Sequence, residues 1–166
     1  MQIPSKTTQI RGLLGWLTLS LAATIIGALA SVHAAAFYAR LAQPRWAPPP
    51  WLFGPVWTAL YAMMGVSAWL VWRRGGLRAQ ARPLTWYLLQ LTVNTLWSWL
   101  FFAWHLGGAA FADIVVLWVL LLGTVRGFLR VQRIAGLLLL PYLAWVSFAA
   151  ALNHAIWRLN PAILGT

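Results

Sequence analysis

Aromatic rings stand beside small or amide-bearing residues at helical spacing in three apolar stretches of the sequence. Residues three, four or seven positions apart share one face of a helix. Three such faces, turned toward one another, would enclose an apolar cavity with flat walls and a few fixed hydrogen-bonding groups, which is the usual form of a small-molecule site. Ordinary bundle packing, with the other tryptophans anchored at a membrane interface, is the alternative that spacing leaves open. The three sets are Trp57 and Tyr61; Asn94, Trp97, Ser98 and Phe101; and Trp145, Phe148, Ala149 and Asn153.

Other polar groups in the apolar stretches are few. The Asn94 amide serves either an interhelical hydrogen bond, worth roughly 0.6 kcal/mol in membranes, or a ligand, and the two roles are compatible. Asp113, the sole carboxylate, lies near the start of a predicted helix, where negative charge is favoured, and we expect a structural role with His105, an Arg or the backbone as partner. His33, His105 and His154 lie in different stretches, so their spacing predicts no metal site. The absence of cysteine excludes disulfides, thiolate catalysis and cysteine-ligated metals.

The composition places these residues in a membrane. The chain has 13 tryptophans, one acidic residue and 62% hydrophobic residues, which leaves too little polar surface for a protein that faces water on all sides. Residues 12–39, 46–72 and 134–157 contain no charged side chain. Each of these stretches exceeds the roughly 20 apolar residues that cross a bilayer as a helix, so the sequence predicts an integral membrane protein.

We expect an all-α fold, in which residues 1–166 form a single domain built as a bundle of five transmembrane helices. The last helix should kink at Pro141, because proline removes a backbone hydrogen bond and its ring clashes with the preceding turn. The predicted helices cover about residues 12–38, 51–72, 84–104, 109–128 and 134–159.

Basic residues flank the predicted helices and indicate their orientation. With five spans, nine Lys and Arg residues fall on one side of the membrane and three, Arg40, Arg45 and Arg158, fall on the other. Because cytoplasmic loops carry the excess of positive charge, we predict a cytoplasmic N-terminus in what we expect to be a bacterial membrane. The net charge of +11 then belongs to residues that meet lipid headgroups, and we expect no nucleic-acid partner. The nine are Lys6, Arg11, Arg73, Arg74, Arg78, Arg82, Arg126, Arg130 and Arg133.

The first apolar stretch permits two interpretations. Lys6 and Arg11, an apolar run and residues 32–36 resemble a cleaved signal peptide, although the run is longer than the usual signal core of ~7–15 residues. A retained helix is the preferred interpretation, because a small residue at every fourth position forms a ridge that another helix can approach closely. The ridge consists of Ala23, Gly27, Ser31, Ala35 and Ala39.

Homodimerisation is predicted from the same kind of spacing. Small residues four apart let two helices approach closely in a membrane. Besides the ridge, the candidates are Ala103-x-x-x-Gly107 and Gly123-x-x-x-Gly127.

Two longer motifs are specific enough to indicate a family. Residues 46–57 read W-x-P-P-x-W-x-F-x-P-x-W, and residues 141–153 read P-Y-x-x-W-x-x-F-A-x-x-L-N. On these motifs, and over about residues 20–160, the chain resembles the tryptophan-rich sensory protein family (TspO/MBR), which includes the mitochondrial translocator protein, formerly the peripheral benzodiazepine receptor.

The resemblance implies a membrane receptor or sensor for porphyrin, haem-type tetrapyrroles and similar flat apolar ligands. The ligand would bind in a tryptophan-lined pocket between helices, under the first loop, with a role in tetrapyrrole regulation or transport. Porphyrin is then a ligand, and neither a cofactor nor a metal is required, because binding in this family is thought to rest on aromatic packing. The expected ligand-binding residues are Trp46, Trp51, Trp57, Tyr61, Asn94, Trp97, Phe101, Trp145, Phe148, Ala149 and Asn153.

The first loop has a mechanical role in this hypothesis. Its prolines restrict φ and disfavour helix in the residues before them, so the loop should be stiff and extended. It would act as a lid that carries Trp46 and Trp51, or else as a plain connector with two interface anchors. Arg40 and Arg45 would pair with porphyrin propionates or with lipid headgroups.

Two other functions remain open. Family members have been associated with degradation of porphyrin in light and oxygen, and the tryptophans that match this role are Trp57 and Trp145. A porphyrin or lipid transporter ranks third, because the sequence lacks the repeats and broken-helix pairs of many transporters. Cholesterol binding is doubtful, because His154 replaces the tyrosine of the Leu/Val–Tyr–Arg pattern that mitochondrial members carry.

Overall fold

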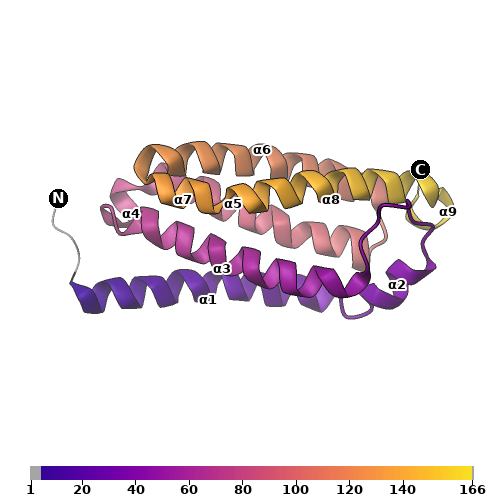
Figure 1. Ribbon diagram of the computed structural model, residues 1–166, viewed down its shortest axis with the longest axis horizontal. Helices are drawn as coiled ribbons and strands as arrows, with labels where there is room; N and C mark the ends of the chain where they lie inside the picture. The colour runs from indigo at the N-terminus through magenta and orange to yellow at the C-terminus, as the bar shows by residue number, and fades with distance from the viewer. Residues whose placement is uncertain (1–4, 166) are drawn as a thin grey trace.

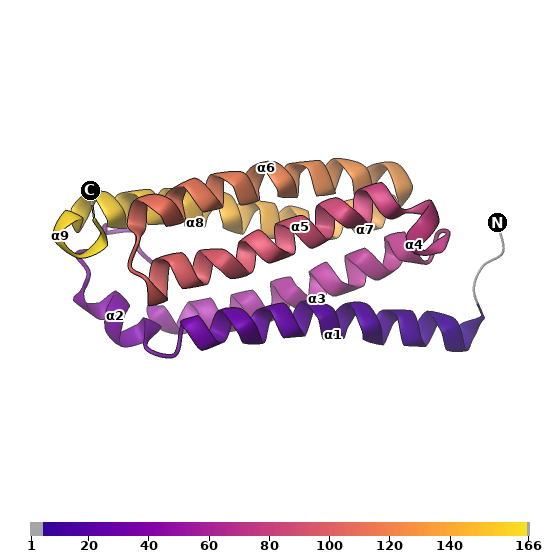
Figure 2. The ribbon, with the colours of Figure 1, turned by 180° about the vertical axis from the view of Figure 1, so that it is seen from behind.

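The computed structural model describes residues 5–165, and within that range the chain is all-helical, with no strand. Five long helices, α1, α3, α5, α6 and α8, run side by side along the long axis of the molecule (Figure 1, Figure 2). They span Lys6–Ala30, Phe53–Trp72, Ala81–Ser98, Gly107–Val131 and Leu140–Leu159. The shorter elements are α2 (Ala34–Arg40), the 3₁₀ turn η1 (Pro50–Leu52), α4 (Gly76–Ala79), the π-helical turn η2 (Trp99–Ala103), α7 (Arg133–Leu138) and α9 (Pro161–Leu164).

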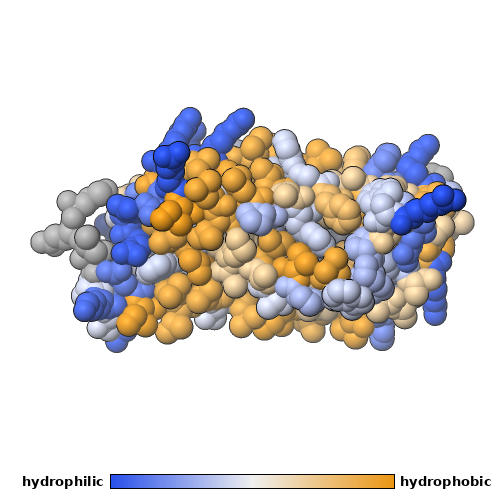
Figure 3. Space-filling view, viewed as in Figure 1, coloured by the Kyte–Doolittle hydropathy of each residue, from blue (hydrophilic) through white to orange (hydrophobic). Residues whose placement is uncertain are grey.

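Four helical segments of the described chain are long and apolar enough to cross a membrane: Lys6–Ala30, Pro50–Trp72, Gly107–Val131 and Arg133–Leu159. Helix α5 lies alongside them but is less apolar (Figure 2). The fifth span therefore stays a prediction. Hydrophilic residues gather at the two ends of the molecule, and a mainly hydrophobic band lies between them (Figure 3).

The two ends of the bundle differ in their connections. The α3–α4 turn and the α6–α7 junction meet at one end, where Arg74 Nη2 donates to Gln132 Oε1 at 2.6 Å. Helix α2, the loop of residues 41–49 and α9 lie at the other end (Figure 1). Helix α1 begins at the end opposite α9 (Figure 1).

The first helix is shorter than predicted. It ends at Ala30, and a turn at residues 31–33 separates it from α2, whereas the sequence predicted one helix to residue 38. The Ser31 hydroxyl donates to the Gly27 carbonyl at 3.0 Å, and the Ser31 N–H bonds to Ala28 O instead of the carbonyl four residues back. A serine that competes for its own helix carbonyl weakens the helix at that point.

The interruption predicted near Pro141 is present, between α7 and α8 at Leu139. Several other boundaries differ from prediction, since α1 begins at Lys6 and α6 spans Gly107–Val131. The third helix begins at Ala81 and its last turn is π-helical, with the Trp104 N–H bonded to Trp99 O at 2.9 Å. His105 follows with a φ of 56°, a left-handed conformation that closes the turn into α6.

Candidate functional site

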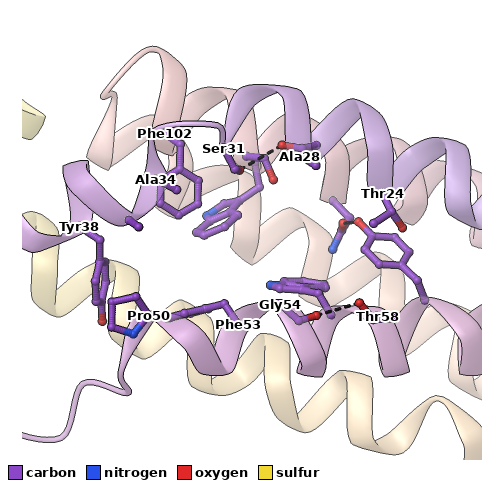
Figure 4. Close-up of a pocket in the computed structure, with 17 residues that line it drawn as sticks. Thr24, Ala28, Ser31, Ala34, Tyr38, Pro50, Phe53, Gly54, Thr58 and Phe102 are labelled. Carbon is purple, nitrogen blue, oxygen red and sulfur yellow. Dashed lines mark hydrogen bonds between the residues drawn. The ribbon is translucent and has the colours of Figure 1, made fainter.

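A cavity of about 470 Å³ lies between α1 and α2 on one side and α3 and α5 with η2 on the other (Figure 4). This volume falls within the roughly 300–1,000 Å³ that small-molecule sites occupy. Helices α1 and α2 contribute Thr24, Gly27, Ala28, Ser31, Ala34, Ala35 and Tyr38; η1 and α3 contribute Pro50, Phe53, Gly54, Trp57, Thr58 and Tyr61; α5 and η2 contribute Asn94, Trp97, Ser98 and Phe102.

Small residues of α1 make the space. Gly27, Ser31 and Ala35 of the predicted ridge line the cavity, together with Ala28 and Ala34. A β-carbon at Gly27 would stand 3.3 Å from Ser98 Oγ, so α1 and α5 are already close at that point. Most of the ridge therefore faces its own bundle or the cavity, whereas Ala39 is exposed outside the lining. The close helix approach predicted for the ridge is made at Gly27 by α5 of the same chain.

The other two dimerisation candidates are also occupied within the chain. Gly123 packs against Trp86, and Gly127 packs against Pro83, both on α5. Gly107 packs against Trp157 and Leu164. A homodimer stays a prediction, but these three motifs no longer indicate where its interface lies.

Two tryptophans from different helices form the flat walls. Trp57 of α3 packs against Tyr61, with ring centroids 5.6 Å apart. Trp97 of α5 stacks on Phe101 at 5.4 Å and 12°, and its Nε1 donates to Asn153 Oδ1 on α8 at 2.9 Å. The hydrogen bond and the stacking hold the Trp97 ring in one orientation.

One end of the cavity is polar. Tyr61 donates its hydroxyl proton to Asn94 Oδ1, and Asn94 Nδ2 donates to the Tyr142 hydroxyl of α8 at 2.8 Å. Tyr142 in turn donates to Gln90 Oε1 at 3.0 Å. The interhelical hydrogen bonds expected of Asn94 are therefore present, and the same residue lines the cavity.

The opposite end is formed by Tyr38 and Pro50. The Tyr38 ring packs edge-on against Phe53 at 5.7 Å, and its hydroxyl donates to Pro48 O at 3.5 Å. Burial raises the pKa of the Tyr38 phenol, so it stays a neutral donor at physiological pH. Tyr38 thereby ties α2 to the proline-rich loop at the edge of the cavity.

The cavity is electrically neutral. Its lining, as far as residues 5–165 define it, contains no Lys, Arg, His, Asp or Glu. Arg40 and Arg45, the candidates for propionate binding, are exposed and outside the lining. The lining therefore offers uncharged walls, and these two arginines lie outside it.

Comparison with known proteins gives a consistent result. The model of the TspO/MBR family matches residues 16–158. The chain belongs to this family. It is 43% identical over 126 residues to the tryptophan-rich protein TspO of Chlorobaculum tepidum, covering 75% of this chain and 80% of the relative. It is 40% identical over 126 residues to the translocator protein of Sus scrofa, at 75% of each chain, and 38% identical over 151 residues to TspO of Archaeoglobus fulgidus, at 86% and 97%.

Family membership and the apolar helices together make the chain an integral membrane protein. Of the eleven predicted ligand-binding residues, Trp57, Tyr61, Asn94 and Trp97 line the cavity. The remaining seven lie elsewhere, in two groups.

The first group is the α8 face with Phe101. Phe101, Ala149 and Asn153 border a separate space of about 30 Å³, on the far side of Trp97 and Phe53. Trp145 packs on Phe53, with centroids 6.0 Å apart, and on Phe148. The three predicted faces therefore do not enclose one cavity: α8 stands behind a partition made by Tyr38, Phe53, Trp97 and Phe102, which border both spaces.

The second group is in the first loop of this TspO/MBR chain. Trp51 is 72% exposed and Trp46 is 50% exposed, with Trp46 edge-on to Phe148 at 5.7 Å. Asn160 fixes the loop, because its Nδ2 donates to Ala42 O at 2.9 Å and its Oδ1 accepts from Ala42 N at 2.8 Å. The loop crosses to α9 before it returns to α3 (Figure 1).

The sequence missed the contribution of α1 and α2. Thr24, Ala28, Ser31 and Tyr38 line the cavity, and Figure 4 shows them facing α3 across the hollow. The small-residue spacing of residues 23–39 is the signal for this contribution, although spacing alone predicts a helix contact there and not a cavity wall. A small residue opposite an aromatic ring leaves space just as readily as it admits a helix.

The histidines and Asp113 take separate positions. His105 stacks on Phe37 at 4.1 Å, and His154 lies beside Phe111 at 5.0 Å. Asp113 Oδ2 is buried, and none of residues 5–165 provides it with a hydrogen-bond partner. None of the predicted partners of Asp113, His105 among them, therefore hydrogen-bonds to this oxygen.

Proposed function

We propose that this TspO/MBR membrane protein is a receptor or sensor that binds porphyrin and similar flat apolar ligands in the cavity between α1, α3 and α5. The observation that carries the proposal is the cavity of about 470 Å³ with the Trp57 and Trp97 rings in its walls and, within residues 5–165, no Lys, Arg, His, Asp or Glu in its lining. An apolar macrocycle gains most from flat aromatic surface and loses least where no charge must be desolvated. Relatives with the names tryptophan-rich sensory protein and translocator protein support the sensory and ligand-handling role.

Charged substituents of such a ligand would lie outside the cavity. Arg40 follows Tyr38 by two residues and is exposed, as is Arg45 in the loop. Guanidinium groups pair with carboxylates in bidentate geometry. In our proposal the macrocycle enters the cavity and its propionates remain at the α2 end, where these arginines can reach them.

A titration of tryptophan fluorescence with protoporphyrin IX tests the proposal. Trp57→Phe should weaken binding, because a phenyl ring covers less of the ligand than an indole. The matched control is Trp118→Phe, since Trp118 lies outside the cavity and donates to Ser147 Oγ at 2.9 Å. Equal affinities of the two variants for protoporphyrin IX would mean that the ligand does not bind in this cavity.

Light-driven porphyrin degradation is the second candidate, and Trp57 favours it because this indole lines the cavity directly. Trp145 stands behind Phe53, so only one of the two candidate tryptophans would touch the ligand without rearrangement. Illumination of the complex in air, followed by the Soret band, separates the two functions. A protein-dependent loss that Trp57→Phe abolishes would support the enzyme, and a stable band would support the receptor.

We also propose that α5 with η2 is the fifth span and that the N-terminus is cytoplasmic. The polar residues that lower the hydropathy of α5 include Gln90 and Asn94, which are buried, whereas Leu88, Leu89 and Leu96 are exposed to the surroundings of the bundle. Because the chain has no cysteine, single substitutions give a clean accessibility test. Arg45→Cys should react with an impermeant maleimide added outside intact cells, and Arg78→Cys should not; the reverse pattern would invert the topology.

A further inference from the structure

Four buried side chains form a hydrogen-bonded chain that leads from the cavity into the centre of the bundle. Tyr61 and Asn94 line the cavity, and the chain continues through Tyr142 to Gln90. Gln90 and Tyr142 are fully buried and border neither space described above. Gln90 Nε2 has no partner among residues 5–165, so the amide is held by its oxygen alone.

The hydrogen-bonded chain of these four side chains runs in one donor-to-acceptor direction, because each tyrosine hydroxyl carries one proton. Gln90 Oε1 accepts the proton of Tyr142, so the Tyr142 oxygen must accept from its other neighbour, which is Asn94 Nδ2. The Asn94 amide is then turned with Oδ1 toward Tyr61, which donates to it. The far end of the chain, at Gln90, thereby fixes what the near end presents to the cavity.

At the near end, lone pairs predominate, and the second N–H of Asn94 Nδ2 is the one donor that the hydrogen-bonded chain leaves there. Asn94 Oδ1 and the Tyr61 oxygen both face a ligand as acceptors. Thr24 and Thr58 beside them donate their protons to the Ser20 and Gly54 carbonyls, at 2.9 Å each, and so present lone pairs as well. The two lining donors without a hydrogen bond to any described residue, Trp57 Nε1 and Ser98 Oγ, belong to residues one helical turn away from Tyr61 and Asn94.

We propose that Gln90 is a positioning residue that sets the hydrogen-bond polarity of the cavity, so that its polar end selects ligands that carry an N–H or O–H donor. The inference rests on the proposed function, namely that this cavity binds a flat apolar ligand. It adds the class of polar group that such a ligand carries at its buried edge.

Removal of the Gln90 acceptor should reverse the donor-to-acceptor direction of these hydrogen bonds. Without an acceptor at position 90, Tyr142 satisfies its proton by donating to Asn94 Oδ1, which requires the Asn94 amide to turn over. Asn94 Nδ2 then donates to the Tyr61 oxygen, and the Tyr61 proton points into the cavity. A substitution that touches no ligand would therefore change the polar end of the cavity from mainly accepting to mainly donating hydrogen bonds.

Two small heteroaromatic probes report this polarity. The ring nitrogen of indole only donates, and that of quinoline, neutral at pH 8, only accepts. Both are titrated by calorimetry into wild type, Gln90→Met and Leu91→Met in one detergent, so partition of each probe into micelles cancels between variants. Leu91 is the matched control, because it is a buried neighbour on α5 without a polar group.

Wild type and Leu91→Met should bind indole more tightly than quinoline, by roughly fivefold for one hydrogen bond. Gln90→Met should bind quinoline more tightly. An unchanged ratio in Gln90→Met, a wild type that prefers quinoline, or a wild type that binds neither probe would each overturn the proposal. Loss of porphyrin binding with the indole preference intact would instead contradict the proposed function alone.

A second variant covers a failure of Gln90→Met to fold. Tyr142→Phe cuts the link between Gln90 and Asn94, so the Asn94 amide is free to turn to either ligand. Its two affinities should come within about a factor of two of each other. A Tyr142→Phe variant that keeps the wild-type preference would show that the chain does not control the cavity.

Discussion

The two sides of α5 carry similar aromatic residues but differ in what stands opposite them. Toward α1, the opposing residues are Gly27, Ala28 and Ser31, and a cavity of about 470 Å³ remains. Toward α6 and α8, the opposing residues include Ile114, Leu117 and Val146, all at most 2% exposed, and only a space of about 30 Å³ remains nearby. The size of the opposing side chain, and not the number of tryptophans, separates the cavity side from the packed side.

A substitution that fills the cavity should have the largest effect on porphyrin affinity. Ala28→Phe places a ring in the space beside Trp57 and should weaken porphyrin binding by at least ~100-fold, the equivalent of roughly 2.7 kcal/mol. The protein should still fold, because the ring enters empty volume. Fluorescence titration measures the affinity, and Ala22→Phe, an exposed position of α1 outside the lining, is the control. Tight binding by Ala28→Phe would place the ligand elsewhere.

Truncation of a side chain should lower the stability of the protein much more on the packed side than on the cavity side. Ile114→Ala on the packed side should lower the free energy of unfolding by about 3 kcal/mol, as buried large-to-small changes do. Thr24→Ala on the cavity side should change it by less than about 0.5 kcal/mol, because its side chain borders space. Thermal unfolding in detergent compares the two variants. Equal losses would mean that the cavity is collapsed in the folded protein.

Trp57 on the cavity side and Trp145 behind Phe53 give a second comparison of the two sides. Trp57→Ala should weaken porphyrin binding by roughly tenfold through the loss of ring contact, with a modest loss of stability. Trp145→Ala should mainly lower stability, because Trp145 supports Phe53 from behind. Titration and unfolding of both variants form the test, and a larger loss of affinity in Trp145→Ala would show that the partition opens when the ligand binds.

A substitution that loosens the first loop should have the smallest effect on ligand binding. Asn160→Leu removes both hydrogen bonds to Ala42 and should loosen residues 41–49, with about a threefold faster release of ligand if the loop acts as a lid. Hydrogen exchange of that segment and stopped-flow release report the two consequences. Faster exchange without faster release would reduce the loop to a connector.

The sequence predicted the long helices well, because apolar length and proline position act locally. The break at Leu139 followed from Pro141, whereas the break at Ser31 did not, because a serine hydroxyl competes for its helix carbonyl only in some contexts. Aromatic spacing identified Trp57, Tyr61, Asn94 and Trp97 as a group. It placed Trp145 with them because spacing gives the face of a helix but not which neighbour that face meets.

The position of a bound metalloporphyrin is the most direct test of the central claim. Zinc protoporphyrin IX soaked into crystals of the protein gives an anomalous signal that locates the centre of the macrocycle. We predict the zinc peak in the space bounded by Gly27, Trp57 and Trp97. A peak beside Trp145 and Phe148, or on the outer surface of the bundle, would contradict the account.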